Sequence, residues 1–472
     1  MQATIRGKNT PLSSPVSYGG EDRRSRTRRA GRRWLRILSR TVAVLLATAA
    51  TAAAQPLVLD GGTIHAAAGE EPFAGRVVID GGRIVAVGEA AEVPEGAVRL
   101  DVAGLHVYPG LCDALSRIGL VEIGAVAATV DTAEIGAYNP HLKAITAVHP
   151  ASEVIPVTRE TGITHAVVAP GTDRDGVVAG QASLLHLAGW TVEEMAIETS
   201  VAMVIAWPEI QTRSFDFATF SVRESPFSEA KEQAEEAQNE LRDWFDAARQ
   251  YQRAMAAGSD RVERDLKLEA LARVLDGQLP VVIQANAKRD LEAAIAFAEE
   301  QDVRLILAGG RDAWKIKDQL AEKKIPVILG RTQSLPAEED DPYDRPYRTA
   351  GELAAAGVTI AFGSSAGGGF GPGGPHSART LPYEAAMAVA FGLPRDVALA
   401  ALTRNPAEIF GRGDELGTIE AGKIANLIVT DGDPLELTTE VRHLIIDGKE
   451  VTTDNRHRAL YEKYRARPGA ER

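Results

Sequence analysis

Short apolar runs alternate with helical patterns through the middle of the chain, and this alternation constrains the fold most strongly. Each apolar run is followed by a helical pattern, for example over residues 290–301 and 312–323. Strands that alternate with helices of about 10–15 residues indicate βα units around a parallel sheet. The apolar runs are residues 161–170, 280–285, 303–308, 326–330 and 357–363.

A region of roughly 300 residues with this pattern suits a (β/α)₈ TIM-like barrel with insertions. A doubly wound α/β sheet is the alternative, but the expected dinucleotide fingerprint is not found where it should be. Within the region, residues 225–278 are long, charged and helical in pattern, and they predict a solvated helical excursion on the barrel rim.

Two β-rich segments flank the barrel region. Residues 56–107 alternate apolar runs with turns, and the pair Asp80-Gly81 predicts a hairpin. The stretch from Leu416 onward shows the same alternation of apolar runs and turns, with a second turn at Asp447-Gly448. We expect a small discontinuous β-sandwich domain, formed by the two ends of the mature chain. Its parts are residues 55–107 and 412–455, with the barrel at 108–411 between them and a C-terminal tail at 456–472.

The first 54 residues have a different composition from the rest. They carry a net charge of +9, whereas the whole chain carries −13, so the remainder carries −22. A basic stretch is followed by a short apolar run, Thr41–Thr51, and by the small residues Ala52–Ala54. This order is typical of a signal peptide. We expect residues 1–54 to be that signal peptide and the mature protein to be periplasmic or secreted. An uncleaved membrane anchor is the alternative, and the Arg32-Arg33 pair leaves the twin-arginine and general export routes both open.

Charge and cysteine content exclude several classes of function. The acidic mature chain argues against binding to nucleic acid or, after signal cleavage, to an anionic membrane surface. The single cysteine, Cys112, excludes an intrachain disulfide and a cysteine metal cluster. We expect Cys112 to be a buried small residue at a strand end.

Several segments resemble the amidohydrolase superfamily, in particular its imidazolonepropionase-like members. Residues 104–114 (GLHVYPGLCDA) are similar to the family's entry into the first barrel strand, PGLIDAH. Residues 357–365 (GVTIAFGSS), 402–407 (LTRNPA) and 416–429 (LGTIEAGKIANLIV) resemble its closing stretch. The resemblance covers about residues 56–450.

The resemblance implies hydrolysis of carbon–nitrogen (non-peptide) bonds with one or two divalent metals, commonly zinc, at the carboxyl end of the barrel. Such a metal lowers the pKa of a bound water so that hydroxide attacks the substrate. In the family the first strand ends in His-x-His, histidines follow on strands five and six, and an aspartate on strand eight serves as ligand and base.

The sequence departs from this ligand pattern at each strand. The positions after PGLIDA hold Leu115, Ser116 and Arg117, of which the first lacks a lone pair and the last is a permanent cation. The strand-five position is Gln284 or Asn286, the strand-six position is Gly309, and the strand-eight position is Ser365. No counterpart of the bridging lysine is found. A rearranged site built from His141, His149 and His376 is an alternative. We expect no metal cofactor.

The remaining polar residues at the predicted barrel mouth either satisfy one another or form a pocket for a small polar or anionic molecule, bound by Arg117 and Arg311. Ser365 as a nucleophile would need a base that the sequence does not identify. The Gly-rich stretch 366–374 is either a cover for the pocket or a plain connection. Three hypotheses remain: an amidohydrolase-type hydrolase, a non-catalytic pocket-binding protein, and a partner subunit in a homo- or hetero-oligomer. The pocket candidates are Asp113, Arg117, Glu122, Gln284, Asn286, Arg311 and Ser365.

Overall fold

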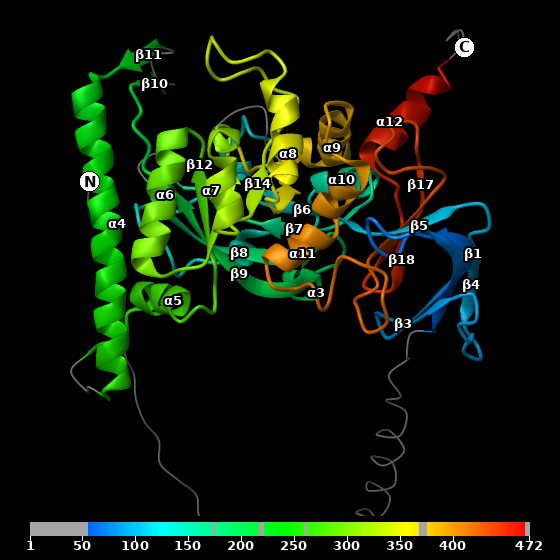
Figure 1. The fold of residues 1–472 in the computed structure, drawn as a ribbon. Helices are drawn as coiled ribbons and strands as arrows, with labels where there is room; N and C mark the ends of the chain where they lie inside the picture. Colours follow the sequence, from blue (N-terminus) through cyan, green and yellow to red (C-terminus); the bar gives the residue numbers. More distant parts are fainter. Residues whose placement is uncertain (1–54, 173–175, 217–220, 259–261, 368–374, 468–472) are drawn as a thin grey trace, which may run out of the picture. The chain divides into compact units, whose positions relative to one another are not determined.

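The computed structural model describes residues 55–172, 176–216, 221–258, 262–367 and 375–467, all within one compact unit, Gln55–Arg472. Two eight-stranded sheets organise this unit (Figure 1). The predicted signal peptide lies outside the described residues. None of the helices that the structure describes is both long and apolar enough to cross a membrane.

The barrel is an almost closed sheet of eight strands in the order β15-β14-β13-β12-β9-β8-β7-β6. Five of the strands were predicted from apolar runs. Seven of the strands run in the same direction, and only β8 runs against them. The barrel strands are β6 (Leu111–Ser116), β7 (Ile163–Val168), β8 (Val178–His186), β9 (Ala196–Ala206), β12 (Val281–Ala285), β13 (Leu305–Gly309), β14 (Val327–Leu329) and β15 (Ile360–Phe362).

The expectation of a helix after every strand, around a fully parallel sheet, is wrong on one side of the barrel. After β7 the chain turns directly into β8, which runs antiparallel to both β7 and β9. All nine residues of β8 are buried. Because a strand covered on both faces has no polar alternation, its sequence gives no period-two signal. A meander therefore replaces a βα unit here.

Helices cover the outside of the remaining strands. α6 shows why they form: Leu291, Ala294, Ile295 and Ala298 recur at helical spacing and are buried, and Asp302 ends the helix in a left-handed conformation with φ 54°. The helices are α2 (Val154–Arg159), α3 (Val192–Met195), α4 (Phe227–Ala256), α5 (Leu266–Leu275), α6 (Lys288–Gln301), α7 (Lys317–Glu322), α8 (Arg345–Ala355), α9 (Leu381–Ala390), α10 (Arg395–Leu402), α11 (Arg404–Ile409) and α12 (Arg456–Arg465). The 3₁₀ turns are η1 (Ala127–Thr129), η2 (Ala144–Ala147), η3 (Ala313–Ile316) and η4 (Pro375–Thr380).

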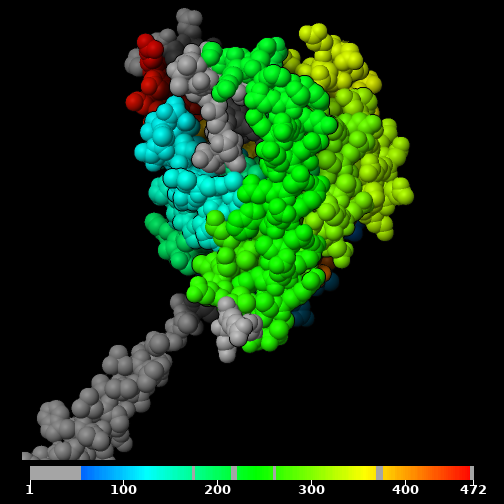
Figure 2. All heavy atoms as spheres, turned by 90° about the vertical axis from the view of Figure 1, so that its left-hand side faces the viewer, coloured from blue at the N-terminus to red at the C-terminus, as the bar shows by residue number. Residues whose placement is uncertain are grey.

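The predicted helical excursion forms α4 and α5, but it is not merely a solvated rim element. One face of the 30-residue α4 is buried, and Phe245 meets Phe297 of α6 edge-on with ring centroids 5.2 Å apart. Arg242 and Arg249 reach from the same helix to Glu300 and Gln301. Figure 2 shows α4 as a continuous green ridge on the face turned to the viewer. A small two-stranded ribbon, β10 (Arg213–Asp216) with β11 (Ser221–Glu224), precedes it.

The second sheet joins strands from both ends of the chain, in the order β18-β17-β16-β5-β1-β2-β3, with β4 beside β1. β16 pairs antiparallel with β5, which brings the two predicted β-rich segments together. Both predicted hairpins form, between β2 and β3 and between β17 and β18. The proposed sandwich and the domain limits stay predictions. The strands are β1 (Leu57–Ile64), β2 (Phe73–Asp80), β3 (Arg83–Gly88), β4 (Val98–Asp101), β5 (His106–Pro109), β16 (Leu427–Thr430), β17 (Val441–Ile446) and β18 (Lys449–Val451).

Truncating the α4 core contact tests whether this helix belongs to the barrel's packing. Phe245→Ala removes a fully buried ring, and we expect the free energy of unfolding to fall by roughly 3–5 kcal/mol. The exposed Glu232→Ala in the same helix should change it by less than about 0.5 kcal/mol. Urea denaturation followed by circular dichroism measures both. Equal stability of the two variants would show that α4 is an appendage.

Candidate functional site

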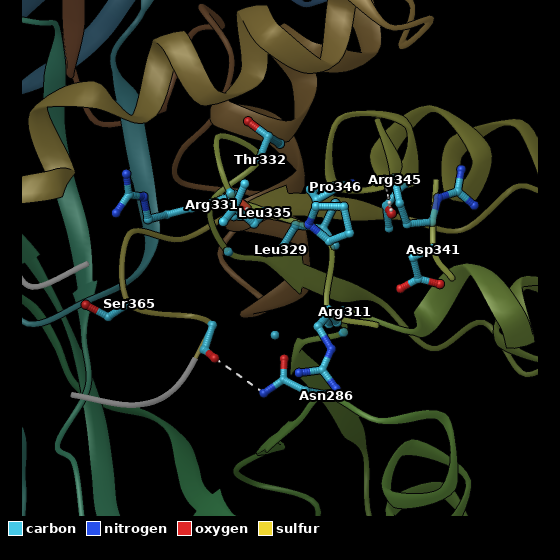
Figure 3. A pocket seen from close by; sticks show the side chains of 18 of the residues that line it. Asn286, Arg311, Leu329, Arg331, Thr332, Leu335, Asp341, Arg345, Pro346 and Ser365 are labelled. Atoms are coloured by element: carbon cyan, nitrogen blue, oxygen red, sulfur yellow. Dashed lines mark hydrogen bonds between the residues drawn. The ribbon is translucent and has the colours of Figure 1, made fainter. Parts of the chain in front are cut away.

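A cavity of about 290 Å³ lies at the carboxyl ends of the barrel strands. Its walls come from the residues that directly follow β6, β12, β13, β14 and β15, and from the segment between β14 and the start of α8. The labelled side chains of Figure 3 come from this lining. The lining residues are Arg117, Asn286, Gly309, Gly310, Arg311, Leu329, Gly330, Arg331, Thr332, Ser334, Leu335, Pro336, Ala337, Asp341, Arg345, Pro346, Thr349, Ser364, Ser365 and Gly367.

Four of the seven residues predicted at the barrel mouth line this cavity: Arg117, Asn286, Arg311 and Ser365. Asn286 donates from Nδ2 to the Gly367 carbonyl at 3.3 Å, the bond dashed in Figure 3. The Oγ of Ser365 is buried and has no hydrogen-bond partner in the part of the chain that the structure describes.

The other three predicted residues do not line the cavity. Gln284 lies within β12, before the strand end. Glu122 lies in the connection after β6, where its Oε1 is buried without a hydrogen-bond partner among the described residues. Asp113 is fully buried within β6 and reaches the cavity only through a neighbour, because its Oδ2 accepts a hydrogen bond at 2.6 Å from the Oγ of Ser364, a lining residue.

Asp113 holds the two edge strands of the barrel together. Its Oδ1 accepts hydrogen bonds from the backbone N–H of Ser364 at 2.9 Å and of Leu115 at 3.4 Å. Burial raises the pKa of Asp113 to about 6, and these hydrogen bonds, by favouring the charged form, act in the opposite direction. Cys112 precedes it and is buried, as expected for a small residue in a barrel strand.

The lining is rich in guanidinium groups. Arg345 forms an ion pair with Glu352 and stacks on Trp314, with its Cζ 4.2 Å from the ring centroid. In contrast, Arg117 and Arg311 have no carboxylate within ion-pair distance among the described residues. Burial lowers the pKa of Arg117, as expected for a cation that is removed from water without a partner. The cavity therefore offers positive charge at Arg117 without an ion pair, whereas Arg311 interacts electrostatically with the Glu209 carboxylate without forming a close ion pair.

These residues do not fit the divalent metal that the resemblance implies. Leu115 offers only hydrocarbon, and Arg117 places a cation at the mouth. Gly309 has a φ of 93°, which side chains rarely adopt, and a Cβ there would lie 3.0 Å from the Ala285 carbonyl oxygen and 2.6 Å from Oδ1 of Asn286, so a histidine at the strand-six position would be strained. No group of three or more His, Cys, Asp or Glu side chains in metal-binding proximity occurs among the described residues.

The histidines considered as replacement ligands lie away from the cavity lining. His149 and His376 are exposed, and His141 is partly buried with its pKa lowered, chiefly by burial. In the predicted Gly-rich cover, residues 368–374 lie outside the described residues, whereas Gly367 belongs to the lining.

Sequence reasoning missed the wall that follows β14. Arg331 comes directly after the predicted strand 326–330, just as Arg311 follows the preceding strand, so the same positional rule could have found it. Leu335, Pro336 and Asp341 follow in an irregular segment without any such signal.

A buried carboxylate on α9 fixes that wall. Oε2 of Glu384 accepts hydrogen bonds from the backbone N–H of Thr332 at 2.8 Å, from its Oγ1 at 2.8 Å, and from the N–H of Gln333 at 2.9 Å. The Nε of Arg331 lies 3.8 Å from the other carboxylate oxygen. Glu384 therefore positions the start of the wall without lining the cavity.

The Amidohydrolase family model matches residues 248–451. Amidohydrolase tasK of Hapsidospora irregularis is 26% identical over 407 residues, which are 79% of this chain and 39% of that protein. Imidazolonepropionase of Aromatoleum aromaticum is 43% identical over 89 residues, 19% of this chain and 21% of that enzyme. The chain thus spans well under half the length of these relatives in each match.

Among solved structures, an amidohydrolase from Thermotoga maritima MSB8 superposes with a TM-score of 0.71 and 29% identity. The match covers 84% of this chain and 99% of that one. Phenylurea hydrolase B gives a TM-score of 0.53 at 14% identity over 84% of this chain and 97% of that one, which shows a shared fold.

Removing the Glu384 carboxylate should loosen the cavity wall. Glu384→Ala leaves backbone and hydroxyl donors without an acceptor, and each donor that water cannot reach costs about 1–3 kcal/mol. We expect lower stability in urea and new protease cleavage within residues 331–344. Glu384→Gln keeps an acceptor oxygen, so its stability in urea should lie between those of the wild-type chain and Glu384→Ala. Unchanged cleavage in Glu384→Ala would contradict the positioning role.

The buried Asp113 should give stability a distinctive pH dependence. Its pKa is about 6 in the folded chain against an ordinary 3.8, so the folded state holds the proton more tightly. The stabilisation is therefore complete below a pH of about 4 and is lost as the pH rises through about 6. Relative to Asp113→Asn, the wild-type chain should lose up to about 3 kcal/mol over this window. Urea midpoints of both proteins measure it, and a pH-independent difference would contradict the raised pKa.

Proposed function

Because the chain belongs to the amidohydrolase superfamily, we propose that it is a hydrolase-like protein whose barrel mouth binds a small anionic molecule without a divalent metal. Arg117 and Arg311 are the residues that we assign to recognition of the anionic group. The observation that carries this proposal is that both guanidiniums line the cavity without a carboxylate at ion-pair distance among the described residues. Guanidinium groups bind carboxylates through paired, charge-assisted hydrogen bonds.

The size and the composition of the cavity define the kind of molecule. A volume of about 290 Å³ lies at the lower end of small-ligand sites, which suits a ligand about the size of an amino acid derivative. Leu329, Leu335 and Pro336 add apolar lining beside the cations. We therefore propose a small carboxylate that carries an apolar or amide-bearing body.

We propose that this chain has lost the metal-dependent mechanism of the family. The replacement of donor side chains by Leu115, Arg117 and Gly309 supports this proposal. Carbon–nitrogen bond hydrolysis, and a relation to imidazolonepropionase in particular, remain hypotheses drawn from the resemblance.

A second candidate role is that of a partner subunit. The similar region makes up only 39% of the length of the Hapsidospora protein, so in that relative it is joined to much additional chain. We propose pairing with a separate amidohydrolase chain as the corresponding arrangement here. Export by the expected signal peptide would place the protein in the periplasm or outside the cell.

Ligand binding can be tested on the purified chain with succinate, glutarate and N-acetylated amino acids as probes. A carboxylate present at about 100 times its Kd should stabilise the fold by about 2.7 kcal/mol, and calorimetry or thermal shift should detect this. Arg117→Gln and Arg311→Gln should each weaken binding roughly 10- to 100-fold. A chelator should have no effect.

Arg304→Gln provides the matched control, because Arg304 is exposed at the opposite end of β13 from Arg311. It should bind like the wild-type chain. Stoichiometric zinc, manganese, iron or nickel in the purified protein, together with chelator-sensitive turnover, would overturn the proposal. An absence of any binding signal in calorimetry or thermal shift with succinate, glutarate and the N-acetylated amino acids would also overturn the proposal.

A further inference from the structure

A hydroxyl and a carboxylate meet at the floor of the cavity. Ser364 follows β15 by two positions, and its Oγ donates to Oδ2 of Asp113 at 2.6 Å. The backbone N–H of Ser364 holds the other carboxylate oxygen at 2.9 Å, which fixes the orientation of the base relative to the hydroxyl. A hydroxyl within hydrogen-bond reach of a base that a third group orients is the arrangement of an activated nucleophile.

The sequence could not reveal this pair. Ser365 takes the position of the strand-eight aspartate, and no base could be named for it. The structure places a base beside the preceding serine instead, from a residue 251 positions earlier in the chain. Ser365 differs from Ser364 because its own Oγ has no hydrogen-bond partner among the described residues.

The carboxylate is suited to the role of a base. Asp113 is completely buried, and burial raises its pKa to about 6. It is therefore mostly ionised at neutral pH, yet it accepts a proton more readily than an exposed aspartate does. General-base efficiency is greatest when the pKa of the base lies near the working pH.

Ser364 lines the same cavity as Arg117, Arg311 and Arg331, and 5% of its surface is exposed. A carboxylate held by the first two arginines would place the rest of the ligand within this cavity, beside the hydroxyl. Guanidinium groups stabilise the negative charge that develops on a carbonyl oxygen under attack, and Arg331, whose Nε lies 3.8 Å from Oε1 of Glu384, is a lining guanidinium that the ligand's carboxylate leaves for this role.

We propose that Ser364 is the nucleophile of a metal-independent acyl transfer, with Asp113 as its base, acting on the ester or amide bond of a small molecule that also carries a free carboxylate. The proposal rests on the anion-binding cavity proposed above. It adds a chemical step that the binding of a carboxylate alone does not require.

The step balances without any further reactant than water. Asp113 takes the proton from Oγ of Ser364 as the oxygen forms a bond to the carbonyl carbon. The bond from that carbon to the leaving oxygen or nitrogen then breaks, and Asp113 passes the proton to the leaving group. Water next gives a proton to Asp113 and attacks the acyl-serine, whose ester bond breaks as Oγ takes the proton back.

A fluorophosphonate probe tests the nucleophile directly in the purified chain, with a chelator present throughout. Peptide mass mapping should find one phosphonate adduct, on Ser364, and a carboxylate that binds the cavity should slow its formation. The mapping uses the wild-type chain, so it does not depend on any variant folding. Ser364→Ala should give no adduct, whereas the exposed Ser228→Ala should react like the wild-type chain.

Two outcomes would overturn the assignment of Ser364 as the nucleophile without affecting the proposed anion-binding cavity. One is the absence of an adduct in a folded chain whose melting temperature rises with carboxylates. The other is an adduct on Ser365 or on another hydroxyl in place of Ser364. Failure of the carboxylates to bind would instead remove the proposed function on which this step rests.

Asp113→Asn should suppress the adduct while the variant still melts cooperatively, and undiminished labelling of that variant would exclude Asp113 as the base.

Discussion

A buried carboxylate bridges the two edges of the barrel sheet. β6 and β15 are the edges of the barrel sheet, and they do not pair along a ladder as the other neighbours do. Asp113 spans the seam by accepting from the backbone and side chain of Ser364, and the N–H of Ser365 adds a bond to the Leu115 carbonyl at 2.9 Å. Burying the Asp113 carboxylate without such donors would cost several kcal/mol, and these hydrogen bonds offset that cost. The residues that follow these two strand ends supply part of the cavity.

The antiparallel strand explains why the cavity is one-sided. In a barrel of βα units, the loops after all eight strands can contribute to the site. Here β7, β8 and β9 form a meander, and the described lining comes from the segments after β6 and after β12 to β15. The functional wall is accordingly concentrated in the half of the barrel that keeps the regular strand–helix order. The irregular segment after β14, fixed by Glu384, closes the cavity on that side.

The sequence predicted β7, β12 to β15 and the two hairpins, but it missed the strand β8 and the role of Glu384, for physical reasons. β12 to β15 were visible because each is a short apolar run followed by a helical or turn-forming stretch. β8 was missed because Gly180, Gln181 and Ser183 interrupt its apolar residues, so it forms neither a continuous apolar run nor a regular alternation. For the site, the predicted residues Arg117 and Arg311, which follow strand ends, lie in the cavity lining, whereas Glu122 does not. Glu384 could not be found, since nothing in its own helix indicates that its carboxylate caps the backbone of a segment some fifty residues earlier.

The same electrostatic argument unites the missing metal donors and the unpaired arginines. A divalent cation and an unneutralised guanidinium at one barrel mouth would repel each other strongly in a partly desolvated space. The guanidinium at Arg117 therefore favours the anion that we propose over a metal ion. Residues 55–472 are acidic overall, so their general field disfavours anions at long range, and screening confines that field to about a nanometre at physiological salt. Under the proposed function, selection for an anion then comes from short contacts inside the cavity, where Arg117 is partly buried and free of an ion-pair partner among the described residues.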